Sequence, residues 1–117
     1  MTRSLKLRSI LAVAGAAALG GLAAFGAAGD TKTGVTVQLF QFRPSPLAVQ
    51  MGTPVTWINQ DDITHTITSG TPDKRDGRFN IQLGGKGQSG SVEFTQPGVY
   101  PYFCDRHQSM RGEIRVN

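Results

Sequence analysis

The sequence predicts an all-β fold, a Greek-key β-sandwich of about seven to eight strands that follows an N-terminal export segment. Short β-rich runs recur between turn signals throughout residues 35–117, and several alternate apolar and polar side chains with the two-residue period of a half-buried strand. No stretch after residue 34 shows a sustained helical period. Many short, regularly spaced strands in one small domain are typical of a sandwich.

Residues 1–28 are expected to be a signal peptide. Three basic and no acidic side chains precede residue 10, and residues 10–28 are an unbroken run of apolar and small residues. This pattern is typical of secretion with cleavage after Ala28. An uncleaved membrane anchor is the alternative, because a helix needs about 20 apolar residues to span a bilayer. Either way we expect an exported domain, periplasmic or otherwise extracytoplasmic, attached to a membrane only if this segment is retained.

The charge of the chain gives no reason to expect a nucleic-acid partner. The whole chain carries a net charge of +4, but three of the positive side chains lie in the expected signal peptide. The remainder is close to neutral, so the basic character belongs mostly to the leader. After the leader, residues 29–34 are expected to be a linker, and residues 35–117 a single domain.

Turn signals divide this domain into about seven candidate strands. Pro, Gly, Asn and Asp gather in short clusters, at residues 43–46, 51–52, 59–62, 70–73 and 96–98. Alternation is clearest in the run that contains Val55 and Trp57. The expected strands are Val35–Phe40, Leu47–Gln50, Pro54–Asn59, Ile63–Thr68, Ser91–Thr95, Val99–Phe103 and Gly112–Val116.

Aromatic side chains are expected to supply much of the core. Trp57, Phe94, Tyr100 and Phe103 all lie in the candidate strands. Alternation along the strand would then place Tyr102 on the outer surface.

Residues 71–90 are the least regular part of the domain. The polar run Asp73–Arg78 is expected to be a solvated loop. Gly84–Gly87 lacks the Lys-Ser/Thr ending of a phosphate-binding loop and no helical pattern follows it, so it predicts a turn into the strand at Ser91. The pair Asp61-Asp62 also indicates a turn, because two adjacent acids seldom form a calcium cage.

Three metal-binding residue types stand three residues apart near the C-terminus. Cys104, His107 and Met110 lie between a strand that ends at Cys104 and a strand that begins near Gly112. One tight loop can aim all three side chains at one point, whereas a continuous strand would turn neighbours three apart to opposite faces. Cys104 is the only cysteine of the chain. A single thiol in an exported protein can be a buried inert side chain, a nucleophile, an intermolecular bridge or a metal ligand.

A fourth donor must come from elsewhere, and His65 is the only other histidine. Two imidazoles and one thiolate in a trigonal arrangement, with a distant thioether, form a blue-copper site. Each residue also has an ordinary interpretation: His65 as a strand residue, Cys104 as a small buried side chain, and Met110 as part of the core.

The domain resembles the cupredoxin family of type 1 blue-copper proteins, in its plastocyanin and amicyanin branch. The resemblance runs from about Val35 to Val116, and its markers are residues 55–62 before His65, residues 97–104 up to the cysteine, and residues 110–114. The Cys-x-x-His-x-x-Met spacing is similar to that of amicyanin, whereas plastocyanin and pseudoazurin place two more residues before the methionine.

The resemblance implies that His65, Cys104, His107 and Met110 bind one copper ion, which cycles between Cu(I) and Cu(II). It also implies that redox partner proteins dock near His107, that no small-molecule substrate exists, and that the protein is a monomer. Family members often have Asn after the first histidine, where it ties the two ligand loops together. This chain has Thr66, whose hydroxyl can form a related hydrogen bond. The side chains around His107 are also more polar than is usual in amicyanin-like loops.

We therefore expect a type 1 blue-copper electron-transfer protein and not an enzyme. Copper oxidases built on this fold flank the cysteine with histidines that serve a second copper centre, but Phe103 and Asp105 flank Cys104. A cysteine nucleophile would need an orienting group that is not recognisable. A zinc site would seldom use Met. A periplasmic copper-binding or delivery protein with the same ligands is the main alternative, and a metal-free interaction module is a third.

Overall fold

The computed structural model describes residues 33–117. The expected signal peptide and nearly all of the expected linker lie outside the described residues. Residues 33–117 contain no helix long and apolar enough to cross a membrane. They form nine strands: β2 (Gly34–Gln38), β3 (Gln41–Arg43), β4 (Leu47–Val49), β5 (Thr53–Asn59), β6 (His65–Thr71), β7 (Lys74–Leu83), β8 (Ser89–Phe94), β9 (Gly98–Phe103) and β10 (Arg111–Val116).

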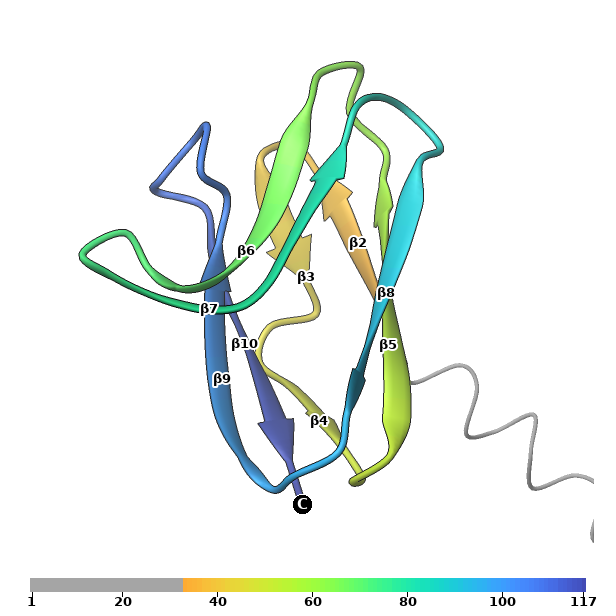
Figure 1. Ribbon diagram of the computed structural model, residues 1–117. Coiled ribbons are helices and arrows are strands. Elements are labelled where there is room, and N and C mark those ends of the chain that lie inside the picture. Colours follow the sequence, from red (N-terminus) through yellow and green to blue (C-terminus); the bar gives the residue numbers. More distant parts are fainter. Residues whose placement is uncertain (1–32) are drawn as a thin grey trace, which may run out of the picture. The chain divides into compact units, whose positions relative to one another are not determined.

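The strands form two sheets that face each other, which confirms the predicted all-β sandwich (Figure 1). One sheet has the order β4-β10-β9-β6-β7 and the other has the order β3-β2-β5-β8. Most neighbours are antiparallel, but β2 runs parallel to β5 and β4 runs parallel to β10. The chain therefore crosses repeatedly between the sheets, and this crossing brings distant segments together at one end of the sandwich.

The core lies between the two sheets. Alternate residues of β2 and β5 point into it, including Val35, Val37, Val55 and Trp57, as the sequence period predicts. Burial of each such side chain stabilises the fold by about 1.5–3 kcal/mol. Other members of this core are Phe42, Leu47, Val49, Ile67, Leu83, Phe94, Tyr102, Cys104, Met110, Ile114 and Val116.

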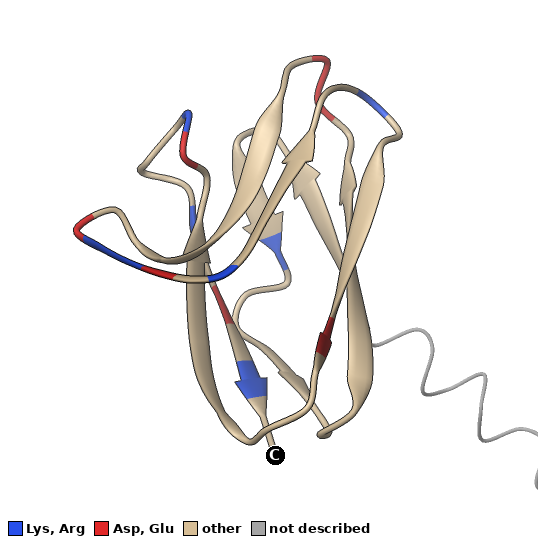
Figure 2. Cartoon of the chain, viewed as in Figure 1, with Lys and Arg blue, Asp and Glu red and all other residues tan. Residues whose placement is uncertain are grey.

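The interpretation of Asp73–Arg78 as a loop is wrong, because most of this segment belongs to β7. Backbone pairing with β6 continues from His65↔Leu83 to Thr71↔Lys74, with an irregularity between Thr68 and Gly70. At the irregularity Gly70 has a φ of +98°, and a Cβ there would lie 2.5 Å from a backbone oxygen of the opposite strand. The charged side chains of this hairpin are solvated and of both signs (Figure 2), so their composition resembles that of a loop.

The first predicted strand also ends earlier than expected. Leu39 and Phe40 have φ values of +54° and +60°, and they form a two-residue turn between β2 and β3. A left-handed backbone costs about 1–3 kcal/mol at a residue other than glycine, and two-residue hairpin turns usually carry Asn-Gly. The alternation of apolar residues at Val35, Val37 and Leu39 predicted a longer strand, but β2 ends at Gln38 and the strained turn follows.

The expected surface position of Tyr102 is wrong. Tyr102 is 1% exposed and packs against Phe42 and Trp57, with ring centroids 4.8 and 5.3 Å apart. Gly112 leaves room for the ring, since a Cβ at Gly112 would lie 2.3 Å from a ring carbon of Tyr102. Phe103 is buried as predicted, but it points away from this core and is covered by the guanidinium of Arg75, 5.4 Å from its ring centroid.

Three connecting segments lie at the same end of the sandwich (Figure 1). They are the turn at residues 39–40, the bends at residues 61–63 and the loop at residues 104–110. This end carries the predicted metal-binding residues.

Candidate metal centre

His65 is the first residue of β6 and is fully buried. The turn before it is organised by Asn59, whose amide donates hydrogen bonds to the carbonyls of Ile63 and Leu83 at 2.8 and 3.1 Å. The side-chain oxygen of Asn59 accepts a hydrogen bond from the backbone N–H of Asp61 at 2.9 Å. Such an Asx turn reverses the chain, and β6 then begins with the buried side chain of His65. The turn predicted at Asp61-Asp62 is thus confirmed.

The C-terminal loop joins β9 to β10 and holds its own shape by backbone hydrogen bonds. The N–H of Cys104 donates to the carbonyl of Met110 at 3.1 Å, and the N–H of Met110 donates to the carbonyl of His107 at 2.9 Å. Because the ends of the loop are paired, Cys104 and Met110 both face the core, where they are 0% and 3% exposed. His107 lies at the outer rim and is partly exposed.

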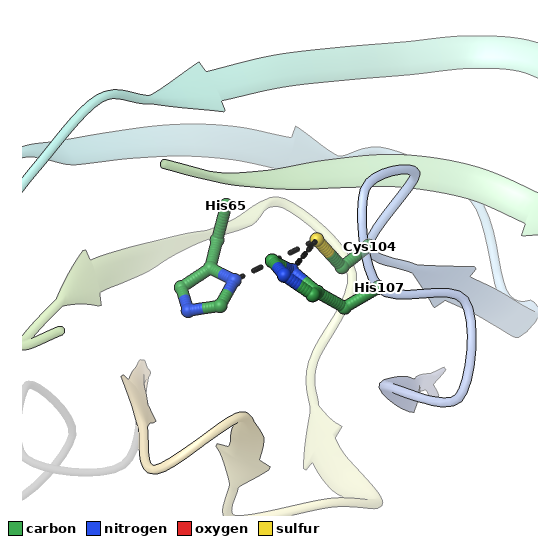
Figure 3. Close-up of side chains that lie close together, drawn as sticks. All are labelled: His65, Cys104 and His107. Carbon is green, nitrogen blue, oxygen red and sulfur yellow. Dashed lines mark hydrogen bonds between the residues drawn. The ribbon is translucent and has the colours of Figure 1, made fainter. Parts of the chain in front are cut away.

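The structure brings His65, Cys104 and His107 together, although 39 residues separate the first two in the sequence. The Nδ1 atoms of His65 and His107 lie 3.7 and 3.9 Å from the Sγ of Cys104. One ligand atom from each residue lies within 4.8 Å of the others. Figure 3 shows both imidazoles turned toward the sulfur.

These separations fit a shared metal ion better than direct hydrogen bonds. A trigonal ion with metal–nitrogen and metal–sulfur bonds of about 2.0 and 2.3 Å would hold the two donor atoms roughly 3.8 Å apart. One thiolate with two imidazoles is a donor set suited to both Cu(I) and Cu(II). Met110 is buried in the same loop, and its backbone pairs with those of Cys104 and His107. A thioether can serve as a weak further ligand in such a site.

Thr66 connects the two segments that carry the candidate ligands. Its N–H donates a hydrogen bond to the Sγ of Cys104 at 3.4 Å, and its hydroxyl accepts one from the N–H of Asp105 at 2.7 Å. The Thr66 hydroxyl also contacts the Thr68 hydroxyl at 2.9 Å, which in turn donates to Asn80 at 2.9 Å. The hydrogen bond expected from a threonine at this position is therefore present.

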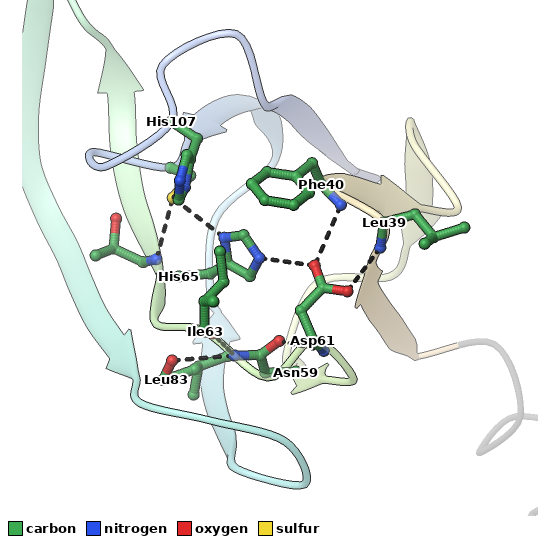
Figure 4. A network of polar contacts seen from close by, with 10 residues as sticks. Leu39, Phe40, Asn59, Asp61, Ile63, His65, Leu83 and His107 are labelled. Atoms are coloured by element: carbon green, nitrogen blue, oxygen red, sulfur yellow. Dashed lines mark hydrogen bonds and ion pairs between the residues drawn. The ribbon is translucent and has the colours of Figure 1, made fainter.

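Asp61 contacts the far side of His65. Its Oδ2 lies 2.8 Å from the Nε2 of His65, and its carboxylate accepts hydrogen bonds from the backbone N–H groups of Leu39 and Phe40 at 2.8 and 3.2 Å (Figure 4). Burial raises the pKa of Asp61, but the hydrogen bonds from Leu39, His65 and Phe40 outweigh burial and leave this pKa below its usual value. A carboxylate at Nε2 favours the tautomer in which Nδ1 carries a free lone pair.

Arg75, in β7, contacts both residues that flank Cys104. Its guanidinium stacks on the ring of Phe103 and donates a hydrogen bond of 2.5 Å to the carboxylate of Asp105. The Arg75 hydrogen bond lowers the pKa of Asp105. The hairpin of β6 and β7 therefore supports the ligand loop from outside the core.

Apolar side chains surround the exposed edge of the site. Leu39, Phe40 and Ile63 are 70%, 48% and 39% exposed. A shallow hollow beside His107 is lined by Ile63, Thr64, Arg106 and His107. The surface next to the histidine is thus mixed, with apolar residues on one side and a basic residue on the other.

Sequence reasoning missed four residues that support this site. Asn59 was expected at the end of a strand and the start of a turn, and Asp61 within that turn, although an Asx motif just before a candidate ligand was a usable signal. Arg75 was assigned to a loop, and Phe40 to a strand. Nothing local in the sequence indicates that these two side chains reach the site.

Comparison with known proteins agrees with this geometry. The family model of copper-binding proteins, plastocyanin/azurin family, matches residues 29–117. Plastocyanin of Scenedesmus fuscus is 31% identical over 93 residues, which cover 73% of this chain and 95% of that protein. Amicyanin of Paracoccus denitrificans is 28% identical, and the alignment covers 99% of each chain.

Solved structures show the same fold. A purple cupredoxin from Nitrosopumilus maritimus superposes with a TM-score of 0.67 and 27% identity, covering 73% of this chain and 99% of that one. A reduced amicyanin variant gives a TM-score of 0.63 and 28% identity, covering 75% and 84% of the two chains. The family match spans the whole described domain, and the chain belongs to the plastocyanin/azurin family of copper-binding proteins.

Proposed function

We propose that this protein carries single electrons through one copper ion bound by His65, Cys104 and His107, with Met110 as the weak fourth ligand. The observation that supports this most strongly is the convergence of two imidazole nitrogens on one thiol sulfur at 3.7 and 3.9 Å. The copper ion would supply the one-electron couple. The chain supplies a donor set that suits both oxidation states.

The surroundings of the donors favour rapid transfer because they resist rearrangement. Cys104 and His65 are fully buried, and Thr66 hydrogen-bonds to the sulfur and to the next residue of the ligand loop. Preorganised ligands move little when the charge changes, which keeps the barrier for electron transfer low. Copper delivery would instead require the loop to open and release the metal.

His107 is the proposed exit for electrons, and a redox partner is proposed to dock on the mixed apolar and basic surface beside it. His107 is the ligand histidine that reaches the rim, while Leu39, Phe40 and Ile63 are exposed beside it. We propose that the protein acts as a monomer, because docking of a partner needs this surface free.

We further propose that the protein is a carrier and not an enzyme. The chain contains only two histidines, and both belong to the proposed copper site. Phe103 and Asp105 flank the cysteine, so no neighbouring imidazole leads to a second metal centre. The pattern of residues 1–28 supports export to the periplasm or another extracytoplasmic space.

Electron exchange and metal transfer would be measured on the same copper-loaded protein. A carrier exchanges electrons rapidly between its oxidised and reduced forms, observed by NMR line broadening, and keeps its metal when mixed with a Cu(I) chelator of moderate affinity. Slow electron exchange combined with rapid transfer of Cu(I) to the chelator would contradict the carrier and support copper delivery.

A further inference from the structure

We propose that Asp61 is a positioning residue that acts on the copper site in two directions: it fixes the ring of His65, and it holds the Leu39-Phe40 turn so that Phe40 covers both ligand imidazoles. This inference rests on the proposed copper site. It assigns a role to a carboxylate that lies outside the ligand set.

The first part of the argument is a count of donors and acceptors. Asp61 presents two oxygens to three N–H donors, the Nε2 of His65 and the backbone nitrogens of Leu39 and Phe40. Its side chain is only 12% exposed, so water supplies little compensation. A carboxylate can accept all three bonds, whereas an amide has one oxygen and would turn an NH₂ group toward at least one donor. The requirement at this position is therefore for a carboxylate and not merely for a polar side chain.

The second part concerns the strained turn. Leu39 and Phe40 both have positive φ, a conformation that favours Asn and Gly over large apolar side chains. The two Asp61 hydrogen bonds go to the N–H groups of these same two residues. Strain of this kind persists only where surrounding structure holds it, and it gathers at functional sites.

The third part is the position of the Phe40 ring. Its centroid lies 5.3 Å from that of His65 and 4.8 Å from that of His107, with interplanar angles of 86° in both cases. The two imidazoles thus meet the same aromatic ring edge to face. Phe40 remains 48% exposed, so it forms a cover between the ligands and solvent (Figure 4). The Phe40 ring therefore separates the proposed copper ligands from solvent. Asp61 hydrogen-bonds both to the N–H of Phe40 and to the Nε2 of His65, so one carboxylate positions both residues.

The matched test compares Asp61→Asn with Asp62→Asn. Both variants remove one negative charge from the same turn, but Asp62 is exposed and its side chain makes no hydrogen bond among the described residues. In the metal-free, reduced protein, ¹⁵N NMR should show a protonated Nε2 and a free Nδ1 on His65 in the wild type and in Asp62→Asn. Asp61→Asn should lose this single tautomer and the contacts between the Phe40 ring and His107. Its affinity for Cu(II) should fall by about 10–100-fold, as is usual when a partner of a ligand histidine is lost.

A second set of variants keeps the test informative if Asp61→Asn alone fails to fold. Leu39→Asn with Phe40→Gly supplies a turn that forms unaided. In this background Asp61→Asn should fold, and the effect on the His65 tautomer can be seen alone. Phe40→Ala should speed removal of copper by a chelator several-fold, whereas Leu39→Ala, which changes the neighbouring exposed residue, should not.

These outcomes separate the inference from the proposed function. If the wild-type protein failed to bind copper, the proposed function would fail, while the tautomer and ring contacts of the metal-free protein would still test Asp61. If Asp61→Asn matched Asp62→Asn in the tautomer, the ring contacts and copper affinity, the role assigned to Asp61 would be overturned. Equal rates of copper removal from Phe40→Ala and Leu39→Ala would overturn the covering role of Phe40.

Discussion

The backbone N–H of Thr66 points at the sulfur of Cys104, 3.4 Å away. A hydrogen bond to the sulfur of a copper ligand draws electron density from the thiolate and thereby influences the reduction potential. The hydroxyl of the same threonine holds the N–H of Asp105, so Thr66 fixes the position of the ligand loop and the environment of its sulfur together. The segment that carries His65 therefore contacts the loop that carries Cys104 through Thr66, which is not a proposed ligand.

Thr66→Val should weaken the fold more than Thr66→Ser. Valine matches the shape of threonine but leaves the N–H of Asp105 without its acceptor, at a cost of about 1–3 kcal/mol in the free energy of unfolding. Serine keeps the acceptor. Urea unfolding of the two variants measures the difference. Equal decreases in the free energy of unfolding would show that the hydrogen bond to the Thr66 hydroxyl does not stabilise the fold.

Arg75→Gln should loosen the ligand loop while leaving the fold intact. Arg75 is the side chain that contacts both Phe103 and Asp105, so its loss should raise amide hydrogen-exchange rates in residues 105–109 several-fold. Arg78→Gln is the matched control, because Arg78 in the same strand stacks on Tyr100 and pairs with Asp76 instead. Similar exchange in both variants would exclude a specific role for Arg75.

Met110→Leu tests the weak fourth ligand. Leucine keeps the buried volume and removes the sulfur, so we expect the copper-loaded protein to stay coloured and its potential to rise by roughly 60 mV or more, a tenfold change for one electron. Met51→Leu is the control, since Met51 is 55% exposed and its N–H pairs with the C-terminal Asn117. Voltammetry that gives equal potentials for both variants would remove Met110 from the ligand set.

Tyr102 should make stability sensitive to alkali. Burial raises the pKa of Tyr102 from 10.0 to about 12. The neutral phenol is therefore favoured in the folded state, and its contribution is complete below pH 10 and is lost as the pH rises from 10 to 12. The loss is roughly 2–3 kcal/mol in the free energy of unfolding. Tyr102→Phe should flatten this decline in a denaturant series at several pH values; an equal decline in both proteins would place the titrating group elsewhere.

The sequence predicted the sandwich and the approximate ranges of most strands, because period-two alternation and turn residues report directly on burial. It also indicated the candidate copper ligands, because the residue types and their spacing can be recognised without the tertiary structure. These candidates are His65, Cys104, His107 and Met110. The comparisons confirm the copper-binding family, while the individual ligands remain a proposal.

The supporting residues could not be predicted in the same way. β7 is an edge strand whose charged side chains are solvated, so hydrophobic periodicity misses it. Tyr102 was expected on the surface but packs against Phe42 and Trp57 of distant strands. Phe103 is buried as predicted, but beside Arg75 of a hairpin distant in sequence. Leu39 continues the apolar alternation of β2, but Leu39 and Phe40 adopt the backbone of a turn, which hydrogen bonds to Asp61 support. The errors at Tyr102 and at the Leu39-Phe40 turn come from long-range contacts, whereas β7 was missed because its side chains are solvated.

The visible absorption of the copper-loaded protein, beside that of Cys104→Ser, tests the central claim most directly. The wild type should bind one copper ion and have an intense blue or green colour, because the Cys104 thiolate donates charge to Cu(II). Cys104→Ser should be nearly colourless with copper. A colourless wild type, or a band of equal strength in the variant, would contradict a copper site built on this sulfur.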